Sequence, residues 1–163
     1  TLSVEALAQR SGRPSLTVGI HFFNPATTMP LVEVVRAAST SDETVAAAEA
    51  FARRCGKEPV HVLDRPGFIV NALLFPYLNS AVRMLEAGTA SMRDIDAAMK
   101  GGCNHPMGPF ELLDLVGLDV AVNILAALHA GFGDPSFEPA PTLRSLVAEG
   151  KLGRKTKQGF YPY

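Results

Sequence analysis

The hydrophobic positions change their pattern near residue 65 of this 163-residue chain. Before that point, three short runs rich in Val, Ile or Phe are typical of strands: Thr17–Phe23, Leu31–Arg36 and Pro59–Leu63. Two stretches predict helices: Ser3–Arg10 and an alanine-rich segment from Ser41 or Asp42 to Cys55, which Gly56 would end. Strand, helix, strand is the order of an α/β domain, so we expect an α/β fold over residues 1–65.

After Asp64–Gly67 the apolar residues recur at helical spacing. The longest such stripe runs from Phe68 to Ala87, and Pro76 inside it predicts a kink. Further helices are expected at Ser91–Met99, Pro109–Val116, Asp119–Gly131 and Thr142–Glu149. Gly101 and Gly102 would end the first of these, and the tail Gly153–Tyr163 reads as irregular or extended. The sequence therefore predicts an all-α unit over residues 66–163.

Composition and charge narrow the class of protein. A net charge of −1 argues against a nucleic-acid partner, which needs a basic surplus. No run is long and apolar enough for a membrane helix, so we expect no membrane span. The two cysteines, Cys55 and Cys103, fit no metal-ligand spacing. We predict reduced, buried thiols, no metal site and a cytoplasmic location.

The start of the chain raises a separate expectation. Thr1 is not a methionine, and no charged-then-apolar leader follows it. A three-stranded sheet with one or two helices leaves a face and an edge uncovered. We therefore expect either that more chain precedes Thr1 or that the missing strands come from elsewhere.

The strongest candidate for chemistry is His21, which lies in one predicted strand, with Glu33 in the next. The segment Asn24–Pro30 between them carries two prolines and reads as a turn. In an antiparallel hairpin centred on Thr27, His21 and Glu33 would lie opposite each other, because both are equally far from the centre. Glu33 stands between valines and needs a partner if it is buried. A carboxylate beside an imidazole orients the ring as a general base.

Other polar residues have a weaker case. Asn24 directly follows the His21 strand, and Asn71 lies one turn into the helical part, where it could donate to a substrate carbonyl. The remaining histidines read as structural, and the basic tail cluster as solvated or interface-forming: His61, His105 and His129; Lys151, Arg154, Lys155 and Lys157. The sequence contains no G-x-G-x-x-G, no phosphate-binding loop and no nucleophile elbow.

Several of these segments together resemble the L-3-hydroxyacyl-CoA dehydrogenase family, especially its bacterial 3-hydroxybutyryl-CoA members. The resemblance runs from Thr1 to Tyr163 and rests on six segments: His21–Pro25, Leu31–Val35, Arg65–Asn71, His105–Leu112, Gly117–Asp119 and the tail with Gly153–Lys155 and Gly159–Tyr161. It implies the last strands of a Rossmann-type NAD-binding domain over 1–65, followed by a helical substrate and dimerisation domain over 66–163. It also implies a homodimer that binds acyl-CoA.

The resemblance assigns roles to the candidate residues. It implies that His21 takes the proton from the 3-hydroxyl of a (3S)-hydroxyacyl-CoA while hydride leaves for NAD⁺, and that Glu33 is its paired carboxylate. It implies that Asn71 holds the substrate and that Asn24 lines the same site, where Asn24 is also a candidate cofactor contact. The family's glycine-rich fingerprint is missing, so we expect a C-terminal portion with most of the NAD site upstream.

Two other interpretations stay open at this stage. The chain could be a non-catalytic dimerisation or substrate-domain fragment with no activity of its own. It could also belong to a related hydroxyacid or phosphogluconate-type dehydrogenase, but those families usually use a lysine base, which the His21 and Glu33 pair speaks against. The sequence does not decide acyl chain length, reaction direction, or NAD against NADP.

Overall fold

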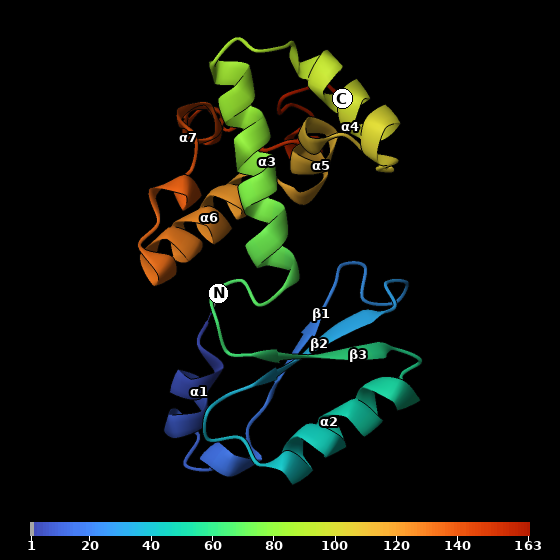
Figure 1. The fold of residues 1–163 in the computed structure, drawn as a ribbon, viewed down its shortest axis with the longest axis vertical. Helices are drawn as coiled ribbons and strands as arrows, with labels where there is room; N and C mark the ends of the chain where they lie inside the picture. Colours follow the sequence, from blue (N-terminus) through green and yellow to red (C-terminus); the bar gives the residue numbers. More distant parts are fainter. Residues whose placement is uncertain (1) are drawn as a thin grey trace. The chain divides into compact units, whose positions relative to one another are not determined.

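The computed structural model describes residues 2–163, and Thr1 lies outside the described residues. Its contacts form two compact units, one ending at Val70 and the other comprising Asn71–Tyr163 (Figure 1). The first unit is α/β and the second is helical. This agrees with a Rossmann-like portion followed by a helical domain.

The first unit is built on a three-stranded sheet. Its elements are α1 (Val4–Arg10), the 3-10 helix η1 (Pro14–Leu16), β1 (Gly19–Phe22), β2 (Leu31–Arg36), α2 (Asp42–Arg54) and β3 (Glu58–Leu63). The strand order is β1-β2-β3, with β2 antiparallel to β1 and parallel to β3. The three predicted strands and two predicted helices are confirmed. Of the two predicted caps, Ser41 and Asp42, it is Ser41 that caps α2.

The two faces of the sheet have different surroundings, because alternate residues of a strand point to opposite sides. Val32 and Val34 of β2 pack with Val45, Ala48 and Ala52 of α2. On the other face, Val35 packs with Val4 of α1 and with Ala37. The helix α1 comes so close that a Cβ at Gly19 would lie 2.8 Å from a methyl of Val4. Glu33 lies on this second face, between the buried valines.

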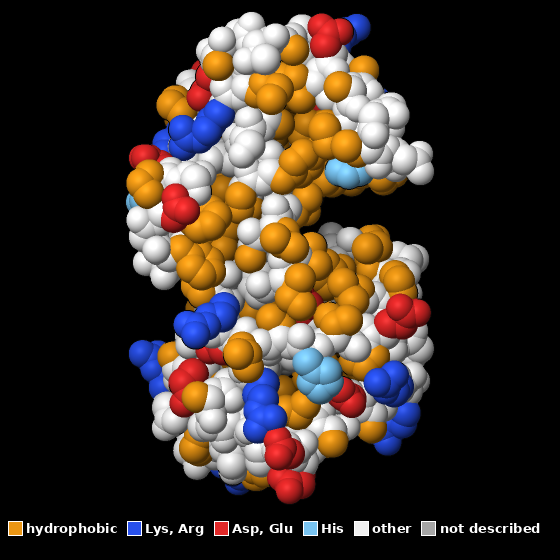
Figure 2. Space-filling model, viewed as in Figure 1, with side chains coloured by type: hydrophobic (Ala, Val, Ile, Leu, Met, Phe, Trp, Pro, Cys, Tyr) orange, Lys and Arg blue, Asp and Glu red, His pale blue; other side chains and the backbone are white. Residues whose placement is uncertain are grey.

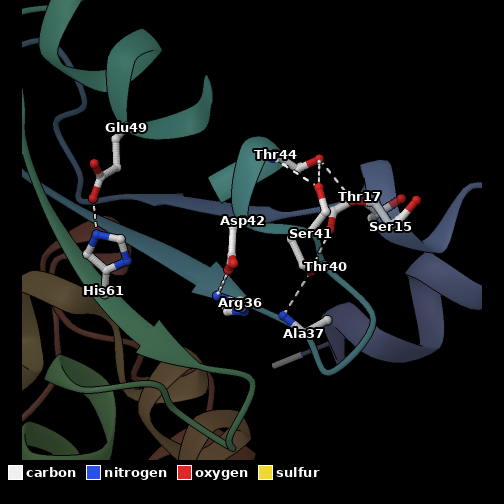
Figure 3. Close-up of polar contacts among 10 residues, drawn as sticks. All are labelled: Ser15, Thr17, Arg36, Ala37, Thr40, Ser41, Asp42, Thr44, Glu49 and His61. Atoms are coloured by element: carbon white, nitrogen blue, oxygen red, sulfur yellow. Dashed lines mark hydrogen bonds and ion pairs between the residues drawn. The ribbon is translucent and has the colours of Figure 1, made fainter. Parts of the chain in front are cut away.

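Hydroxyl groups tie the start of α2 to the segment that leads into β1 (Figure 3). Thr40 Oγ1 accepts from Ala37 N and donates to Thr17 O at 2.7 Å. The Ser41 amide and the Thr44 hydroxyl both donate to Ser15 O. These bonds satisfy backbone groups in the connection between β2 and α2, and they fix the helix that covers one face of the sheet.

The second unit contains five helices joined by short connections. They are α3 (Val70–Glu86), which begins in the last residue of the first unit, α4 (Met92–Cys103), α5 (Pro109–Val116), α6 (Leu118–Phe132) and α7 (Pro141–Ala148). Two 3-10 turns, η2 (Pro135–Phe137) and η3 (Arg154–Thr156), complete it. The predicted helices are all present, and their apolar stripes share one core around Phe110, Leu113 and Leu125.

Two helix boundaries differ from prediction. The helix expected from Phe68 begins only at Val70, because Gly67 and Phe68 have positive φ angles of 75° and 51° and form a turn. The helix expected to stop at Met99 continues through both glycines to Cys103. It ends where Asn104 takes the left-handed conformation, with φ 55°, and caps the helix. Glycine in a helix interior costs roughly 1 kcal/mol relative to alanine, which α4 tolerates at both positions.

The prediction of buried thiols is wrong, since Cys55 and Cys103 are both exposed and free. Each lies at a helix end, where the side chain reaches solvent. Among residues 2–163, no group of three or more His, Cys, Asp or Glu side chains could hold a metal ion. No single helix in the same range is long and apolar enough to span a membrane; only α5 and α6 together, bent by 97°, pass that test.

Candidate active site

The candidate site starts from the pairing of β1 with β2. In the observed register His21 lies opposite Glu33, so the predicted antiparallel pairing is confirmed. His21 Nδ1 lies 2.7 Å from Glu33 Oε2. Side chains of directly opposed residues project from the same face of a sheet, so the backbone alone brings the two groups into bonding distance.

The Glu33 carboxylate is completely buried and has hydrogen-bond donors on both oxygens. Oε2 faces His21, while Oε1 accepts from the amides of Ile69 and Val70, each at 3.0 Å. A buried carboxylate needs such partners, and the start of a helix favours negative charge. The two amide bonds were not predicted, because the sequence alone does not show that the turn before α3 returns to β2.

The His21 ring is held by its neighbours but is not closed off. Its ring centroid lies 4.8 Å from that of Phe23 and 5.6 Å from that of Phe68. The side chain keeps 32% of its accessible surface. A neutral ring that donates from Nδ1 to Glu33 leaves a lone pair on Nε2, which is the arrangement of a general base.

The two candidate asparagines are in different units. Asn24 is exposed in the bend after β1, and Asn71 is a half-buried residue in the first turn of α3. Among residues 2–163, no protein group forms a hydrogen bond with either side chain amide. Both amides are therefore open to a ligand, and their assigned roles stay predictions.

The other histidines make local contacts. His61 on β3 pairs with Glu49 of α2 on the face of the sheet that α2 covers, where the His61 side chain itself stays exposed (Figure 3). His129 Nδ1 bonds the carbonyl of Asp134, and His105 stacks edge-on against Tyr77. These contacts agree with the structural interpretation of all three rings.

Most of the basic tail is engaged within the helical unit. Lys155 pairs with Asp119 and lowers the pKa of that carboxyl through its hydrogen bond. Lys151 pairs with Glu149, and the Arg154 guanidinium lies over the ring of Tyr163. The tail is therefore packed onto the unit by charge pairs and aromatic contact.

A polar pocket of about 230 Å³ also lies in the helical unit, lined by Arg93, Asp96, Lys100, Glu111 and Tyr161. The buried Asp96 accepts from Phe110 N, Glu111 N and the Tyr161 hydroxyl. Lys100 bonds Glu111. Asp96 and Glu111 already have hydrogen-bond partners within the protein. We therefore interpret the pocket as part of the packing of α4 and α5 against the tail.

Comparison with known proteins places two family models on the chain. The model described as "3-hydroxyacyl-CoA dehydrogenase, C-terminal domain" matches residues 67–163, and "3-hydroxyacyl-CoA dehydrogenase, NAD binding domain" matches residues 1–65. The second match corrects in part the expectation drawn from the missing fingerprint. The glycine-rich loop is absent from the sequence, but residues 1–65 do belong to the NAD binding domain.

Individual relatives agree with both matches. A probable 3-hydroxybutyryl-CoA dehydrogenase of Deinococcus radiodurans is 46% identical over the whole chain, which covers 59% of that protein. The mitochondrial hydroxyacyl-coenzyme A dehydrogenase of Sus scrofa is 49% identical, again over the whole chain and 52% of the relative. The crystal structure of (S)-3-hydroxybutyryl-CoA dehydrogenase PaaH1 from Ralstonia eutropha superposes with a TM-score of 0.97 at 45% identity, covering 100% of this chain and 58% of that one. The chain thus spans little more than half the length of these relatives.

Proposed function

Because this chain belongs to the 3-hydroxyacyl-CoA dehydrogenase family, we propose that it serves the NAD-dependent interconversion of (3S)-hydroxyacyl-CoA and 3-oxoacyl-CoA. The observation that carries the proposal is the contact of 2.7 Å between His21 Nδ1 and the buried carboxylate of Glu33. That contact leaves Nε2 with a lone pair on a partly exposed ring. The names of the relatives above support the substrate class.

His21 acts as the base and acid of the reaction. Nε2 removes the proton of the substrate's 3-hydroxyl as the alcohol becomes a ketone, and the protonated ring returns it in the reverse direction. Glu33 holds the ring with the proton on Nδ1 and stabilises the positive charge that forms. Asn71 donates its side-chain amide to the substrate.

The cofactor site is shared between this chain and a segment outside it. Bound NAD⁺ would supply the acceptor for the hydride of the substrate's third carbon. Asn24 lies just beyond the end of β1, the strand that carries His21. Its exposed amide fits a contact with the nicotinamide end. The pyrophosphate loop has no counterpart in residues 1–163.

We also propose a homodimer formed through residues 66–163. Hydrophobic side chains gather over large areas of the helical unit's visible face (Figure 2). Val120 and Phe132 of α6 are exposed, and the part of α6 between them contains no Lys, Arg, Asp or Glu. Uncharged exposed surface of this kind marks association sites. The two free thiols support a reducing compartment, and we propose a cytoplasmic location.

The activity is tested on the chain joined to the part of the Deinococcus relative that this chain does not cover. Acetoacetyl-CoA and NADH are supplied, and loss of NADH absorbance is followed. We expect turnover by this fusion protein and a loss on the order of 10²- to 10⁴-fold in kcat for His21→Gln. The control is His61→Gln, an exposed histidine of the same unit, which should keep its rate. Undiminished turnover by His21→Gln would contradict the proposal.

The 163-residue chain alone tests the division of the cofactor site. Because the pyrophosphate loop is outside its sequence, we expect no tight NADH binding when the cofactor's fluorescence is titrated with the chain. Tight binding would overturn the shared cofactor site. An inactive fusion protein that still folds would favour the non-catalytic fragment.

A further inference from the structure

The turn Pro66–Ile69, which leads into α3, contains an unusual residue. Gly67 has φ 75° and Phe68 has φ 51°. Glycine adopts this region freely, but a residue with a Cβ meets its own carbonyl there, and a bulky aromatic is rarely found in it. Conformations of this kind persist only where surrounding contacts fix them, and they gather at functional sites.

The turn places two successive amides on one oxygen atom. Ile69 N and Val70 N both lie 3.0 Å from Glu33 Oε1. Consecutive N–H groups converge in this way where a left-handed residue precedes a helical one, and such a concave group binds anions. Two donors fill the lone pairs of Oε1, so the carboxylate cannot rotate without losing them. Its other oxygen is thereby held toward His21 Nδ1.

The ring of Phe68 connects this turn to its surroundings. It packs against the buried cluster of Val4, Val35 and Ala37 on the Glu33 face of the sheet. Its centroid also lies 5.6 Å from that of the His21 ring, at an interplanar angle of 58°. One side chain therefore anchors the strained turn to the core and also borders the imidazole.

We infer that Phe68 is a positioning residue for the His21–Glu33 pair. Its left-handed backbone directs two amides to Glu33 Oε1, and its ring holds both the turn and the imidazole in place. The geometry of the His21–Glu33 pair is then fixed by this turn and ring and does not require a bound substrate. The effect on catalysis rests on the proposed function, but the effect on the geometry of His21 does not.

The first test is ring-nitrogen NMR of His21 in the 163-residue chain, which reports the nitrogen that carries the proton. We expect one tautomer, protonated on Nδ1, in the unmodified chain and in Phe68→Tyr, which keeps the ring. Phe68→Leu should give a mixture, because the turn and carboxylate lose their anchor. Phe51→Leu, which changes an exposed phenylalanine on α2, is the matched control and should leave the His21 signals unchanged. His21 signals unchanged in Phe68→Leu would overturn the inference.

A second measurement needs no variant and guards against a Phe68→Leu chain that does not fold. The Ile69 and Val70 amides of the unmodified chain should exchange with solvent on the order of 100-fold more slowly than in an unstructured peptide, because both are bonded to a buried acceptor. Exchange at the unstructured rate would overturn the inference.

The third test is kinetic and uses the fusion protein described above. Phe68→Leu should lower kcat by roughly tenfold with little change in KM, and Phe68→Tyr should restore the rate, because a positioning residue acts on the transition state rather than on binding. Unchanged kcat in Phe68→Leu beside a changed tautomer would overturn the catalytic consequence. If the unmodified fusion protein is inactive while the NMR effect is present, the proposed function fails and the structural inference stands.

Discussion

At the residue scale, the Glu33 carboxylate serves two neighbours at once. One oxygen orients the imidazole and the other receives the first amides of the segment entering α3. The catalytic candidate and the start of a helix therefore depend on the same buried group. A substitution at Glu33 tests how this carboxylate sets the state of the ring.

Glu33→Gln should keep the shape of the side chain but reverse the polarity of the bond to His21. Its carbonyl oxygen can still accept from Ile69 and Val70, so the amide nitrogen then faces Nδ1 and donates to it. The ring must carry its proton on Nε2, where no lone pair remains for the substrate. We expect kcat of the fusion protein to fall on the order of 10²- to 10⁴-fold with a small change in KM, as for other bases held in the wrong tautomer.

The control for this substitution is Glu43→Gln, which changes an exposed glutamate in the first turn of α2 of the same unit. It should leave kcat unchanged. A Glu33→Gln protein that turns over at the normal rate with the ring still protonated on Nδ1 would contradict the assigned orientation.

How much of the candidate site can be predicted from the sequence depends on the kind of contact. The pairing of His21 with Glu33 could be predicted because both residues are equally far from the centre of the turn. In a short hairpin, the position of the turn fixes which residues lie opposite each other. The bonds from Ile69 and Val70 could not be found in the same way. They require Phe68 to leave the helical conformation that its place in an apolar stripe predicts, and tertiary contacts decide that choice.

At the scale of elements, the C-terminal segment is held to α5 by one buried acid. Asp114 is 1% exposed and accepts from Phe160 N, Tyr161 N and the Tyr163 hydroxyl. Gly159 and Gly153 pass so near Asp114 that a side chain at either would overlap it. The sequence indicated only an irregular tail; it could not indicate that a buried carboxylate organises it.

Asp114→Ala should lower the free energy of unfolding by about 2–4 kcal/mol, because the tail's donors lose their acceptor in a buried site. Urea denaturation of the 163-residue chain, followed by circular dichroism, measures this. Glu138→Ala is the control, since its exposed carboxylate lies 3.6 Å from Arg144 and such surface pairs contribute less than about 1 kcal/mol. An equal loss in both variants would contradict the anchoring role.

The three tyrosines of the chain belong to the helical unit, and burial raises the pKa of each: Tyr77, Tyr161 and Tyr163. For Tyr161, the hydrogen bond to Asp96 raises the pKa further. The unfolded chain loses these protons near pH 10, while the folded chain still holds them. The contribution of these three groups to the free energy of unfolding is therefore fully present below pH 10. It is lost as the pH rises toward their folded-state pKa values.

This predicts a lower free energy of unfolding at about pH 11 than at about pH 8. Tyrosinate absorbance should stay low in the folded chain and rise as it unfolds. Tyr161→Phe should make the decline shallower, because one of the linked groups is gone. Early ionisation of all three phenols in a chain that stays folded would contradict the prediction.

At the scale of the whole molecule, the boundary between the two units falls where the apolar pattern of the sequence changes. Contacts separate the units after Val70, close to the change in pattern near residue 65. Periodicity indicates such a change well, because a sheet and a helical bundle bury apolar residues at different spacings. It does not indicate exposure at helix ends, which is why the prediction that Cys55 and Cys103 are buried is wrong.

The last prediction concerns association of the chain through α6. Val120 is exposed and Ala127 partly exposed, two turns apart on this helix, with no Lys, Arg, Asp or Glu between them. If this surface is buried against a second copy, Val120→Lys with Ala127→Lys places charges in a desolvated interface, where they lack partners. We expect the unmodified chain to sediment as a dimer at micromolar concentration and the double variant as a folded monomer. Ala46→Lys, on the exposed side of α2, should remain dimeric, and a dimer that survives the double variant would exclude α6 as the interface.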